Sequence, residues 1–460
     1  MTSAKHYTTR VALAVALGGF LMGFDASVIS GVVTFIEPEF GLTKIELGWS
    51  VASLTLAATL AMAISGPLSD RIGRRPVLKV AATLFAISAV ASGLAPNFTA
   101  LVAARMLGGL GVGAALIIAP MYIGEIAPAA MRGRLVSFNQ LNIVIGISAA
   151  FFSNYLILRL GSSELAWTET LHLDEWSWRW MLGVEALPAM FYLAALLTVP
   201  ESPRWLLMHG RDDEARSVLC RVSDGVQAAA AISAVKASIE AESGIRRPAL
   251  RDLFGPSMKG VMVIAVAVAV LQQMTGINSV FFYAPMIFEQ SGIGTDASFM
   301  QAVLVGLVNL IFTVFAILFV DRLGRRPLLG AGLLGITVCM LIIACGFAAA
   351  ERNPMLILVG ILGFVASFAF SLGPVMWVLF SELFPNRIRG LAISFVGLIN
   401  SAVSFLVQLI FPWELENLGN SVTFAVYAVF AIVGFVFLMW RLPETKGKSL
   451  EELELELVRR

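Results

Sequence analysis

The chain has few charged residues: Asp, Glu, Lys and Arg make up only 14% of its 460 residues, whereas a soluble domain has about 25%. Hydrophobic residues make up 58% of the chain, and the mean hydropathy is +0.84. These values exclude an ordinary soluble protein and indicate a membrane protein. The apolar segments show no alternation of polar and apolar residues, which excludes a transmembrane β-barrel.

Residues that commonly serve catalysis and metal binding are also scarce. The three cysteines and three histidines lie apart from one another, so we expect no disulfide and no metal site: Cys220, Cys339, Cys345, His6, His172 and His209. The sequence has no Gly-x-x-x-x-Gly-Lys-Ser/Thr pattern, so ATP is not the expected energy source. We therefore expect neither an enzyme nor a cofactor. With 32 basic and 31 acidic residues, the net charge of +1 gives no reason to expect a nucleic-acid partner.

Long apolar segments are abundant. Since about 20 apolar residues cross the hydrocarbon core, the sequence predicts twelve membrane-spanning helices, near residues 11–36, 48–69, 77–95, 100–124, 134–158, 180–199, 260–290, 298–320, 327–349, 355–381, 390–413 and 420–441. The first segment follows Lys5 and Arg10 but lacks a small-residue cleavage pattern. It is therefore expected to be a retained helix and not a signal peptide.

One long polar stretch divides the chain. We predict an N-terminal six-helix half at 1–200, a cytoplasmic linker with short helices at 201–259, a C-terminal six-helix half at 260–442 and a cytoplasmic tail at 443–460. If both termini are cytoplasmic, the opposite side has only Lys44, Arg159, Arg179 and Arg352, and Arg105 lies within a helix. All the other basic residues lie on the cytoplasmic side. This bias predicts that both termini and the linker are cytoplasmic.

The two halves repeat each other. Asp70-Arg71-Ile72-Gly73-Arg74-Arg75-Pro76 recurs as Asp321-Arg322-Leu323-Gly324-Arg325-Arg326-Pro327. Glu125, Pro128, Arg132 and Gly133 recur with the same spacing as Glu382, Pro385, Arg389 and Gly390, and Pro200-Glu201 recurs as Pro443-Glu444. Three repeated pairs in the same order predict two six-helix halves in parallel repeat, with a substrate site between them and alternating access around it.

These motifs resemble those of the sugar porters of the major facilitator superfamily. The resemblance is found in Gly66 to Arg75, Arg105 to Gly113, Pro200-Glu201-Ser202-Pro203-Arg204, Gln272-Gln273 with Gly276-Ile277-Asn278, and Pro443 to Gly447. It spans nearly the whole chain, and bacterial proton-coupled pentose and hexose symporters look most similar. It implies an all-α membrane protein with the major facilitator fold.

Two ionisable residues stand out inside predicted spans, where a charge is costly and is by default a functional candidate. Asp25 lies in the middle of the first span, and Arg105 begins a glycine-rich stretch of the fourth. We expect Asp25 to bind the driving proton and Arg105 to control its release, because a carboxylate stays ionised beside a guanidinium and gains a proton when separated from it. Proton-coupled members of the family are similar in having an acid at this place. The alternative is a static buried pair that fixes helix packing.

A neutral sugar needs side chains that both donate and accept hydrogen bonds, together with an aromatic face. On one continuous helix, Gln272, Gln273 and Asn278 would lie within about 60–140° of one another. By resemblance, the residues that match sugar-contacting positions are Gln140, Gln272, Gln273, Asn278, Asn309, Trp377 and Asn400. Alternatively, these amides only join helices through hydrogen bonds. Gly373-Pro374 and Pro285 permit bends beside this site, as hinges or as fixed kinks.

Charged residues at the ends of helices form a third candidate group. We expect them to act as gate elements that pair when the cytoplasmic side is closed and separate when it opens: Asp70, Arg71, Arg74, Arg75, Glu125, Arg132, Glu185, Glu201, Asp321, Arg322, Arg325, Arg326, Glu382 and Arg389. The alternative is that the arginines only set the orientation of the helices.

The sequence therefore predicts a secondary transporter that imports a pentose or hexose with a proton. A facilitative uniporter, in which Asp25 is structural, is the first alternative, and a sugar receptor is the second. The expected partners are the sugar, the proton and the lipid bilayer, and the expected location is the plasma membrane, as a monomer in a bacterial inner membrane. The amides do not encode which sugar is bound.

Overall fold

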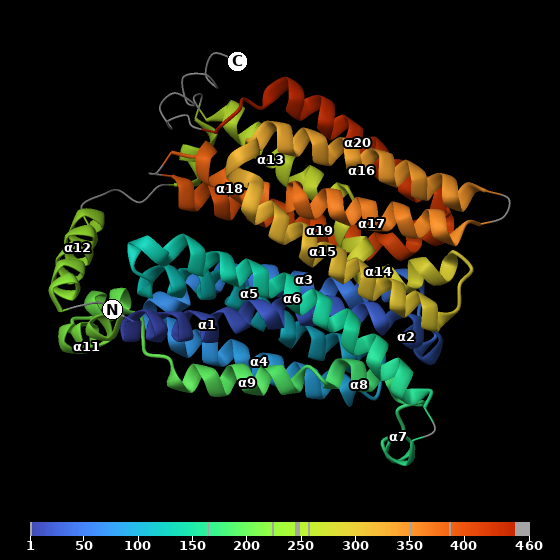
Figure 1. Ribbon diagram of the computed structural model, residues 1–460, viewed down its shortest axis with the longest axis horizontal. Helices are drawn as coiled ribbons and strands as arrows, with labels where there is room; N and C mark the ends of the chain where they lie inside the picture. Colours follow the sequence, from blue (N-terminus) through green and yellow to red (C-terminus); the bar gives the residue numbers. More distant parts are fainter. Residues whose placement is uncertain are drawn as a thin grey trace. The chain divides into compact units, whose positions relative to one another are not determined.

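The computed structural model describes residues 2–163, 165–222, 225–243, 249–255, 258–349, 352–385 and 388–446, and this part of the chain is helical without strands. The predicted tail at 447–460 lies outside the described residues. Twelve of the described helices or helix pairs are long and apolar enough to cross a membrane, which confirms the predicted spans. Figure 1 shows their order along the chain.

Helices of the first sequence half are α1 (Thr2–Val28), η1 (Ile29–Gly31), α2 (Val33–Phe40), α3 (Lys44–Ile72), α4 (Arg74–Gly93), α5 (Phe98–Ile126), α6 (Ala129–Gly161), α7 (Ala166–Thr170), α8 (Ser177–Gly183) and α9 (Ala186–Thr198). The polar stretch forms α10 (Pro203–Met208), α11 (Asp212–Val222), α12 (Gly225–Ser243) and η2 (Leu250–Phe254).

Helices of the second half are α13 (Lys259–Met274), α14 (Ile277–Gln290), α15 (Thr295–Leu323), α16 (Arg325–Ala348), α17 (Pro354–Phe370), α18 (Leu372–Leu383), α19 (Arg389–Asn417) and α20 (Asn420–Arg441). The seventh and tenth spans are thus each divided in two. Gly276, with φ of +82°, separates α13 from α14, and Ser371 separates α17 from α18. The prediction of one continuous helix through Gln272 and Asn278 is therefore wrong. Gly276 adopts a positive φ, which glycine tolerates and which interrupts a right-handed helix.

Helix starts follow local sequence signals. The Asn97 side chain accepts a hydrogen bond from the backbone N–H of Ala100 at the start of α5, and the Asn353 side chain does the same for Leu356 at the start of α17. Each side chain satisfies one of the backbone donors that a helix leaves unpaired at its first turn. Such caps fix where a span begins after a short loop.

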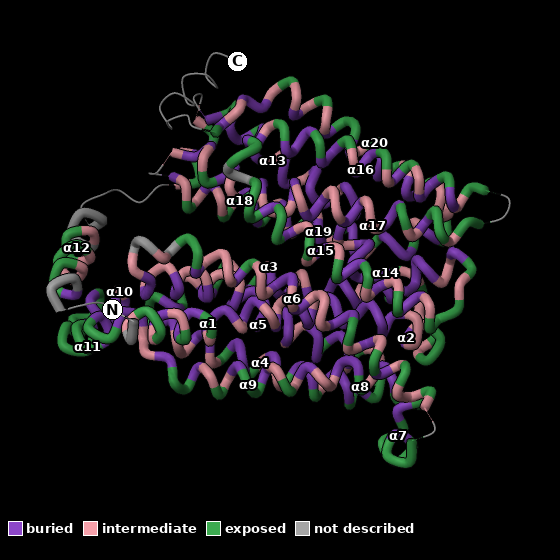
Figure 2. Tube along the Cα trace, viewed as in Figure 1, coloured by how far each residue is buried: buried purple, intermediate pink, exposed green. Residues whose placement is uncertain are grey.

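Many of the described helices are apolar on two faces. One face packs against neighbouring helices, and the other is exposed on the surface of the protein. On α9, Ala189, Tyr192 and Leu196 are buried, whereas Leu187 and Phe191 are exposed. Figure 2 shows α9 and α20 with buried and exposed positions alternating along their length. Exposed apolar faces suit a bilayer, in which lipid tails cover them.

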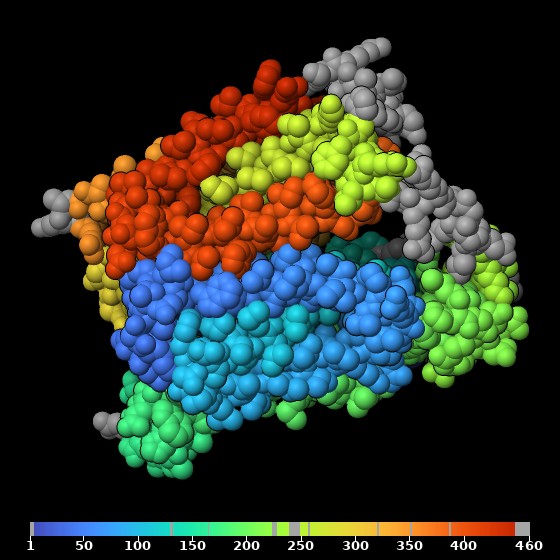
Figure 3. Space-filling view, turned by 180° about the vertical axis from the view of Figure 1, so that it is seen from behind, coloured from blue at the N-terminus to red at the C-terminus, as the bar shows by residue number. Residues whose placement is uncertain are grey.

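By contacts, the chain divides into two units. Unit 1 comprises Met1–Ala26, Leu56–Ala150 and Trp178–Arg247, and unit 2 comprises Ser27–Thr55, Phe151–Ser177 and Pro248–Arg460. Unit 2 therefore includes segments from both sequence halves. In unit 1, the linker helices α10 and α11 lie beside the end of α3 and the start of α4, as Figure 3 shows in green and blue. The indole N–H of Trp205 on α10 donates to the backbone oxygen of Asp70 on α3, at 3.0 Å.

Candidate functional site

Unit 1 contains a buried pair of opposite charges. A guanidinium nitrogen of Arg105 on α5 lies 3.5 Å from Oδ1 of Asp25 on α1, and each side chain is only 2% exposed. Asp25 Oδ2 has no hydrogen-bond partner among the described residues. The two side chains are therefore held together mainly by the attraction of their opposite charges. One carboxylate oxygen of Asp25 remains to take a proton.

Glycine lets the pair form. A Cβ atom on Gly108 of α5 would lie 2.5 Å from Asp25 Oδ2 and 2.6 Å from the Ser88 hydroxyl. Any larger side chain at this position would collide with the carboxylate. The glycine-rich stretch after Arg105 therefore makes room for an acid between three helices.

Glu185 belongs with this pair and not with the charges at the helix ends. It lies between α8 and α9, is 2% exposed, and interacts electrostatically with both Asp25 and Arg105. Its Oε1 has no hydrogen-bond partner in the described part of the chain. Sequence position alone had grouped Glu185 with the gate residues, because nothing in the sequence shows that the sixth span packs this residue toward the first and fourth.

Unit 2 contains a cluster of four amides, which we call the amide cluster: Gln272, Gln273, Asn278 and Asn400. The Asn400 amide group donates to Gln272 Oε1 at 2.8 Å and to the backbone oxygen of Ala269 at 2.9 Å. Gln273 donates to Asn400 Oδ1 at 3.2 Å, and Asn278 donates to Gln273 Oε1 at 2.8 Å. The structure thus brings four of the seven predicted sugar-contacting residues together, across the break at Gly276.

The other three predicted residues are not among the members of this hydrogen-bonded cluster. Asn309 is buried on α15, and Trp377 is 43% exposed on α18. Gln140 is exposed on α6 and belongs to unit 1, so its position relative to the amides is not described. The bends beside the cluster lie near the predicted prolines: Ser371 precedes Gly373-Pro374, and Tyr283, with non-helical φ and ψ, precedes Pro285.

An apolar hollow in unit 2 is a poor alternative for a sugar. It has a volume of about 400 Å³ and is lined by five apolar side chains: Phe312, Phe315, Phe319, Leu323 and Phe370. Sugar hydroxyls placed there would lose their hydrogen bonds to water without replacement. The amide cluster therefore remains the candidate sugar site.

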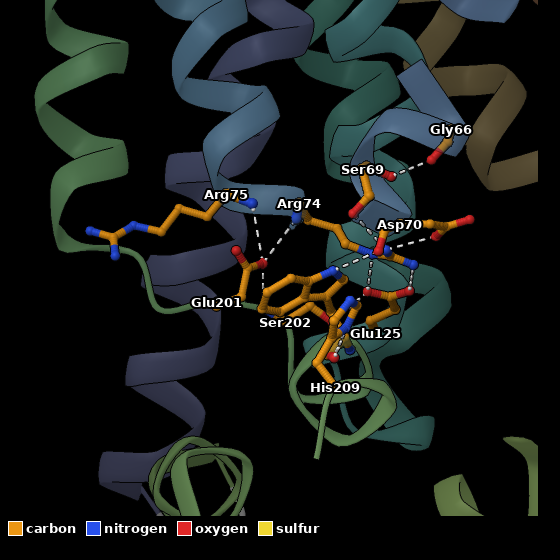
Figure 4. Close-up of polar contacts among 10 residues, drawn as sticks. Gly66, Ser69, Asp70, Arg74, Arg75, Glu125, Glu201, Ser202 and His209 are labelled. Atoms are coloured by element: carbon orange, nitrogen blue, oxygen red, sulfur yellow. Dashed lines mark hydrogen bonds and ion pairs between the residues drawn. The ribbon is translucent and has the colours of Figure 1, made fainter. Parts of the chain in front are cut away.

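Charged side chains at one end of unit 1 form a compact network, shown in Figure 4. Arg74 donates to Glu125 at 3.0 and 3.1 Å and to Asp70 at 2.8 Å. Glu201 Oε1 accepts from the backbone N–H groups of Arg74 and Arg75, and the Ser202 hydroxyl donates to Glu125. The loop after α9 is thereby tied to the start of α4.

Unit 2 repeats this network with equivalent residues. Arg325 pairs with Glu382 at 2.7 Å, and the Thr445 hydroxyl donates to Glu382 at 2.6 Å. Glu444 accepts from the backbone N–H groups of Arg325 and Arg326. Gly73 and Gly324 both have positive φ, and a Cβ on either would lie within 3 Å of Glu201 or Glu444. The sequence repeat is therefore a repeat of the structure.

Several predicted gate residues contact backbone oxygens of their own half. The Arg75 side chain donates to the backbone oxygen of Leu197, Arg326 donates to that of Met439, and Arg389 donates to that of Phe384. Arg71 and Arg322 are exposed. The side chains of Arg132 and Asp321 lie outside the described part of the structure. Ser202 and Thr445, which complete the two networks, were not selected from sequence, although each directly follows a repeated Pro-Glu pair.

Replacing Glu125 by Gln is expected to destabilise unit 1. Arg74 is buried, and loss of the Glu125 charge leaves only the more exposed Asp70 to compensate it, which costs about 1–3 kcal/mol. A thermal-unfolding measurement in detergent should show a clear fall in the midpoint. The matched control is Glu214→Gln, which breaks an exposed Arg211–Glu214 pair and should leave the midpoint unchanged. Equal midpoints for both variants would contradict the assigned role of Glu125.

The hydrogen bonds of Glu444 predict that unit 2 becomes less stable at acid pH. Burial raises the pKa of Glu444, but the backbone N–H groups of Lys446, Arg325, Arg326 and Thr445 donate to it and hold its pKa below the ordinary 4.5. Its contribution to stability is therefore complete above pH 4.5 and is lost as the pH falls through the lower folded pKa. Unfolding midpoints between pH 6 and 3.5 should fall less steeply for Glu444→Gln than for the native protein, and parallel curves would refute this.

Comparisons with known proteins show which family the chain resembles. The family model described as "Sugar (and other) transporter" matches residues 11–457. The chain is 37% identical to an arabinose-proton symporter of Bacillus subtilis, covering 96% of this chain and 94% of that one, and 37% identical to a D-xylose-proton symporter of Escherichia coli, covering 98% and 96%. It is 35% identical to a glucose transport protein of Synechocystis, covering 98% of each.

Solved structures agree. An inward-open conformation of the E. coli xylose transporter XylE superposes with a TM-score of 0.84 at 36% identity, covering 98% of this chain and 100% of that chain. The same transporter bound to 6-bromo-6-deoxy-D-glucose gives 0.76 at 37% identity, covering 98% and 99%. These matches confirm the predicted fold of two six-helix halves.

Proposed function

The chain belongs to the sugar (and other) transporter family, and we propose that it imports a monosaccharide together with a proton. The relatives that it matches are transporters and not enzymes. The observation that carries this proposal is the buried Asp25–Arg105 pair within membrane-spanning helices. An unused carboxylate oxygen at such a position is costly unless it serves a proton or a substrate. The names of the symporter relatives support the same conclusion.

The charges around Asp25 suit a proton carrier. Two carboxyl groups, Asp25 and Glu185, share a single guanidinium, Arg105. If both acids were ionised, the site would have one buried negative charge in excess, and one bound proton removes it. We propose that Asp25 takes this proton from outside and that Arg105 approaches Asp25 to release it inward. A uniporter would need no such arrangement.

The amide cluster suits the sugar. The amides of Gln272, Gln273, Asn278 and Asn400 bond one another. Amides both donate and accept, so a sugar hydroxyl can take over these bonds without leaving a buried polar atom unpaired. Trp377, 43% exposed on α18, is proposed to contact the apolar face of the sugar ring. Gln140 and Asn309 are proposed as further contacts from their resemblance to the family.

The two charge networks suit a gate. Arg74–Glu125 and Arg325–Glu382 each hold the ends of helices within one half. We propose that these halves, 1–200 and 260–442, move as bodies around the bound sugar, with the linker 201–259 and both termini on the cytoplasmic side. The other predicted gate residues of the two repeats would then form ion pairs when the cytoplasmic side is closed and separate when it opens.

The test is sugar uptake by purified protein in proteoliposomes that contain a pH-sensitive dye. Under an imposed proton gradient we expect one of xylose, arabinose, glucose or galactose to enter and to acidify the lumen. Sugar entry without acidification of the lumen would show that the protein is a uniporter and not a proton symporter. Absence of both, with the protein correctly folded by its unfolding transition, would overturn the proposal.

A further inference from the structure

One face of α19 connects the amide cluster to a helix of the first sequence half. Asn400, Ser404 and Gln408 are spaced four residues apart, so they lie above one another on the same face. The Ser404 hydroxyl accepts from the Asn278 amide group at 2.7 Å and from the Gln408 amide group at 2.7 Å. Ser404 thus joins an amide-cluster residue to Gln408.

Gln408 continues this connection to α3. The Thr55 hydroxyl donates to Gln408 Oε1 at 2.9 Å, across 353 residues of sequence. Gln408 is only 1% exposed, and its backbone oxygen also accepts from the Tyr283 hydroxyl on α14 at 2.9 Å. The side chains of Thr55, Gln408, Ser404, Asn278 and Gln273 therefore form one unbroken series of hydrogen bonds, all within unit 2.

The start of α3 packs closely on α19 beside this series. A Cβ on Gly48 would lie 2.0 Å from the backbone oxygen of Leu409, and the rings of Trp49 and Phe405 meet edge to face at 5.9 Å. In the proposed orientation this end of α3 faces outside, since α3 begins at Lys44 on the side with few basic residues. The contact therefore closes the outer ends of α3 and α19 onto each other.

The hydrogen bonds of the series converge on Ser404, whose hydroxyl oxygen accepts from both Asn278 and Gln408. Asn278 donates through its amide nitrogen to both Gln273 and Ser404, so its Oδ1 is the atom that can accept from a sugar hydroxyl. An amide that accepts a hydrogen bond becomes a stronger donor, because hydrogen bonds in series polarise one another. A bound sugar would thereby strengthen the bond from Asn278 to Ser404 and fix the Ser404 oxygen to which Gln408 also donates.

We propose that Ser404 and Gln408 are positioning residues that couple sugar binding at the amide cluster to closure of α3 against α19 on the outer side. This inference rests on the proposed transport function. Neither residue needs to touch the sugar, and the effect passes through Asn278 and Thr55.

The test measures outer-side closure directly. In a parent protein with Cys220, Cys339 and Cys345 replaced by Ser, Ala52→Cys places a reporter on the α3 face of Gly48 and Thr55, where Ala52 is fully buried. An impermeant maleimide added outside labels it only when the outer side opens. We expect a saturating transported sugar to slow labelling by about fivefold or more, the usual scale of coupling between sites.

Gln408→Leu and Ser404→Ala are expected to reduce this protection to less than about twofold, while sugar affinity changes by less than about threefold, because only the coupling is removed. Thr55→Val, nearly identical in shape, should give the same result if Gln408→Leu fails to fold. The matched control is Gln301→Leu on α15, where the glutamine Oε1 has no partner among the described residues; it should keep full protection.

The outcomes separate the two proposals. Full protection in folded Gln408→Leu, Ser404→Ala or Thr55→Val would overturn the coupling role, and so would a parent that transports sugar without any protection. A parent that neither binds nor transports sugar would instead overturn the proposed function, which uptake by the same vesicles reports independently.

Discussion

Asp25→Asn abolishes sugar-driven proton uptake and preserves sugar exchange: this is the largest effect that we expect. Asparagine has nearly the shape of aspartate but cannot bind or release a proton near neutral pH. Arg105 then keeps a neutral hydrogen-bonding neighbour in place of a titrating one. Lumenal acidification should fall to the level of protein-free liposomes, while exchange of labelled for unlabelled sugar continues at a comparable rate.

The control for this prediction is Asp296→Asn. Asp296 is also paired with an arginine, Arg159, at 2.7 Å, but both side chains are more than half exposed. This variant should retain both proton uptake and exchange. If Asp25→Asn still acidifies the lumen as the native protein does, Asp25 is not the carrier, and the static buried pair is the better interpretation. Loss of exchange as well as acidification would show that Asp25 also supports the sugar site.

Gln273→Leu is expected to weaken sugar binding by about 10- to 100-fold, since losing a hydrogen-bond partner from a buried polar site costs about 1–3 kcal/mol. Gln273 bonds Asn400, Asn278 and Gln272, so its loss removes the donor to Asn400 Oδ1 and one of the two acceptors of the Asn278 amide group, in addition to any sugar contact. Leucine fills a similar volume without polar atoms. Isothermal titration of the purified protein with its transported sugar measures the change.

The number of protons taken up per sugar should stay unchanged in Gln273→Leu, because Gln273 and Asp25 belong to different units. Gln301→Leu again serves as the control and should bind sugar normally. Native affinity in Gln273→Leu would mean that the amides only join helices, which is the alternative that the sequence left open.

The fold was largely predictable because its main determinant is local. Each of the twelve spans can be recognised from its own stretch of apolar sequence. The repeated Asp-Arg-x-Gly-Arg-Arg and Pro-Glu motifs mark equivalent helix ends. The structure confirms that Arg74–Glu125 and Arg325–Glu382 are equivalent pairs. Local signals did not show that the seventh span breaks at Gly276, since a glycine within an apolar run is compatible with a continuous helix.

The candidate site was predictable in part. Asp25 and Arg105 were identified because a charge within a span is rare and costly, and their pairing follows from packing of α1 against α5. Gln272, Gln273, Asn278 and Asn400 were identified by resemblance. Ser404, Gln408 and Thr55 were not, because serine, threonine and single amides are common in membrane helices and gain a role only through their neighbours.

The sequence by itself determined that the chain spans a membrane, where its helices lie, that it repeats and which family it belongs to, since hydropathy and motif spacing are properties of the chain alone. Only the tertiary structure decided which polar groups meet. It moved Glu185 from the charges at the helix ends to the Asp25–Arg105 pair, and it joined Thr55 to Gln408 across 353 residues. Hydrogen bonds and ion pairs act over about 3 Å, so their partners are set by how helices pack and not by their order in the sequence.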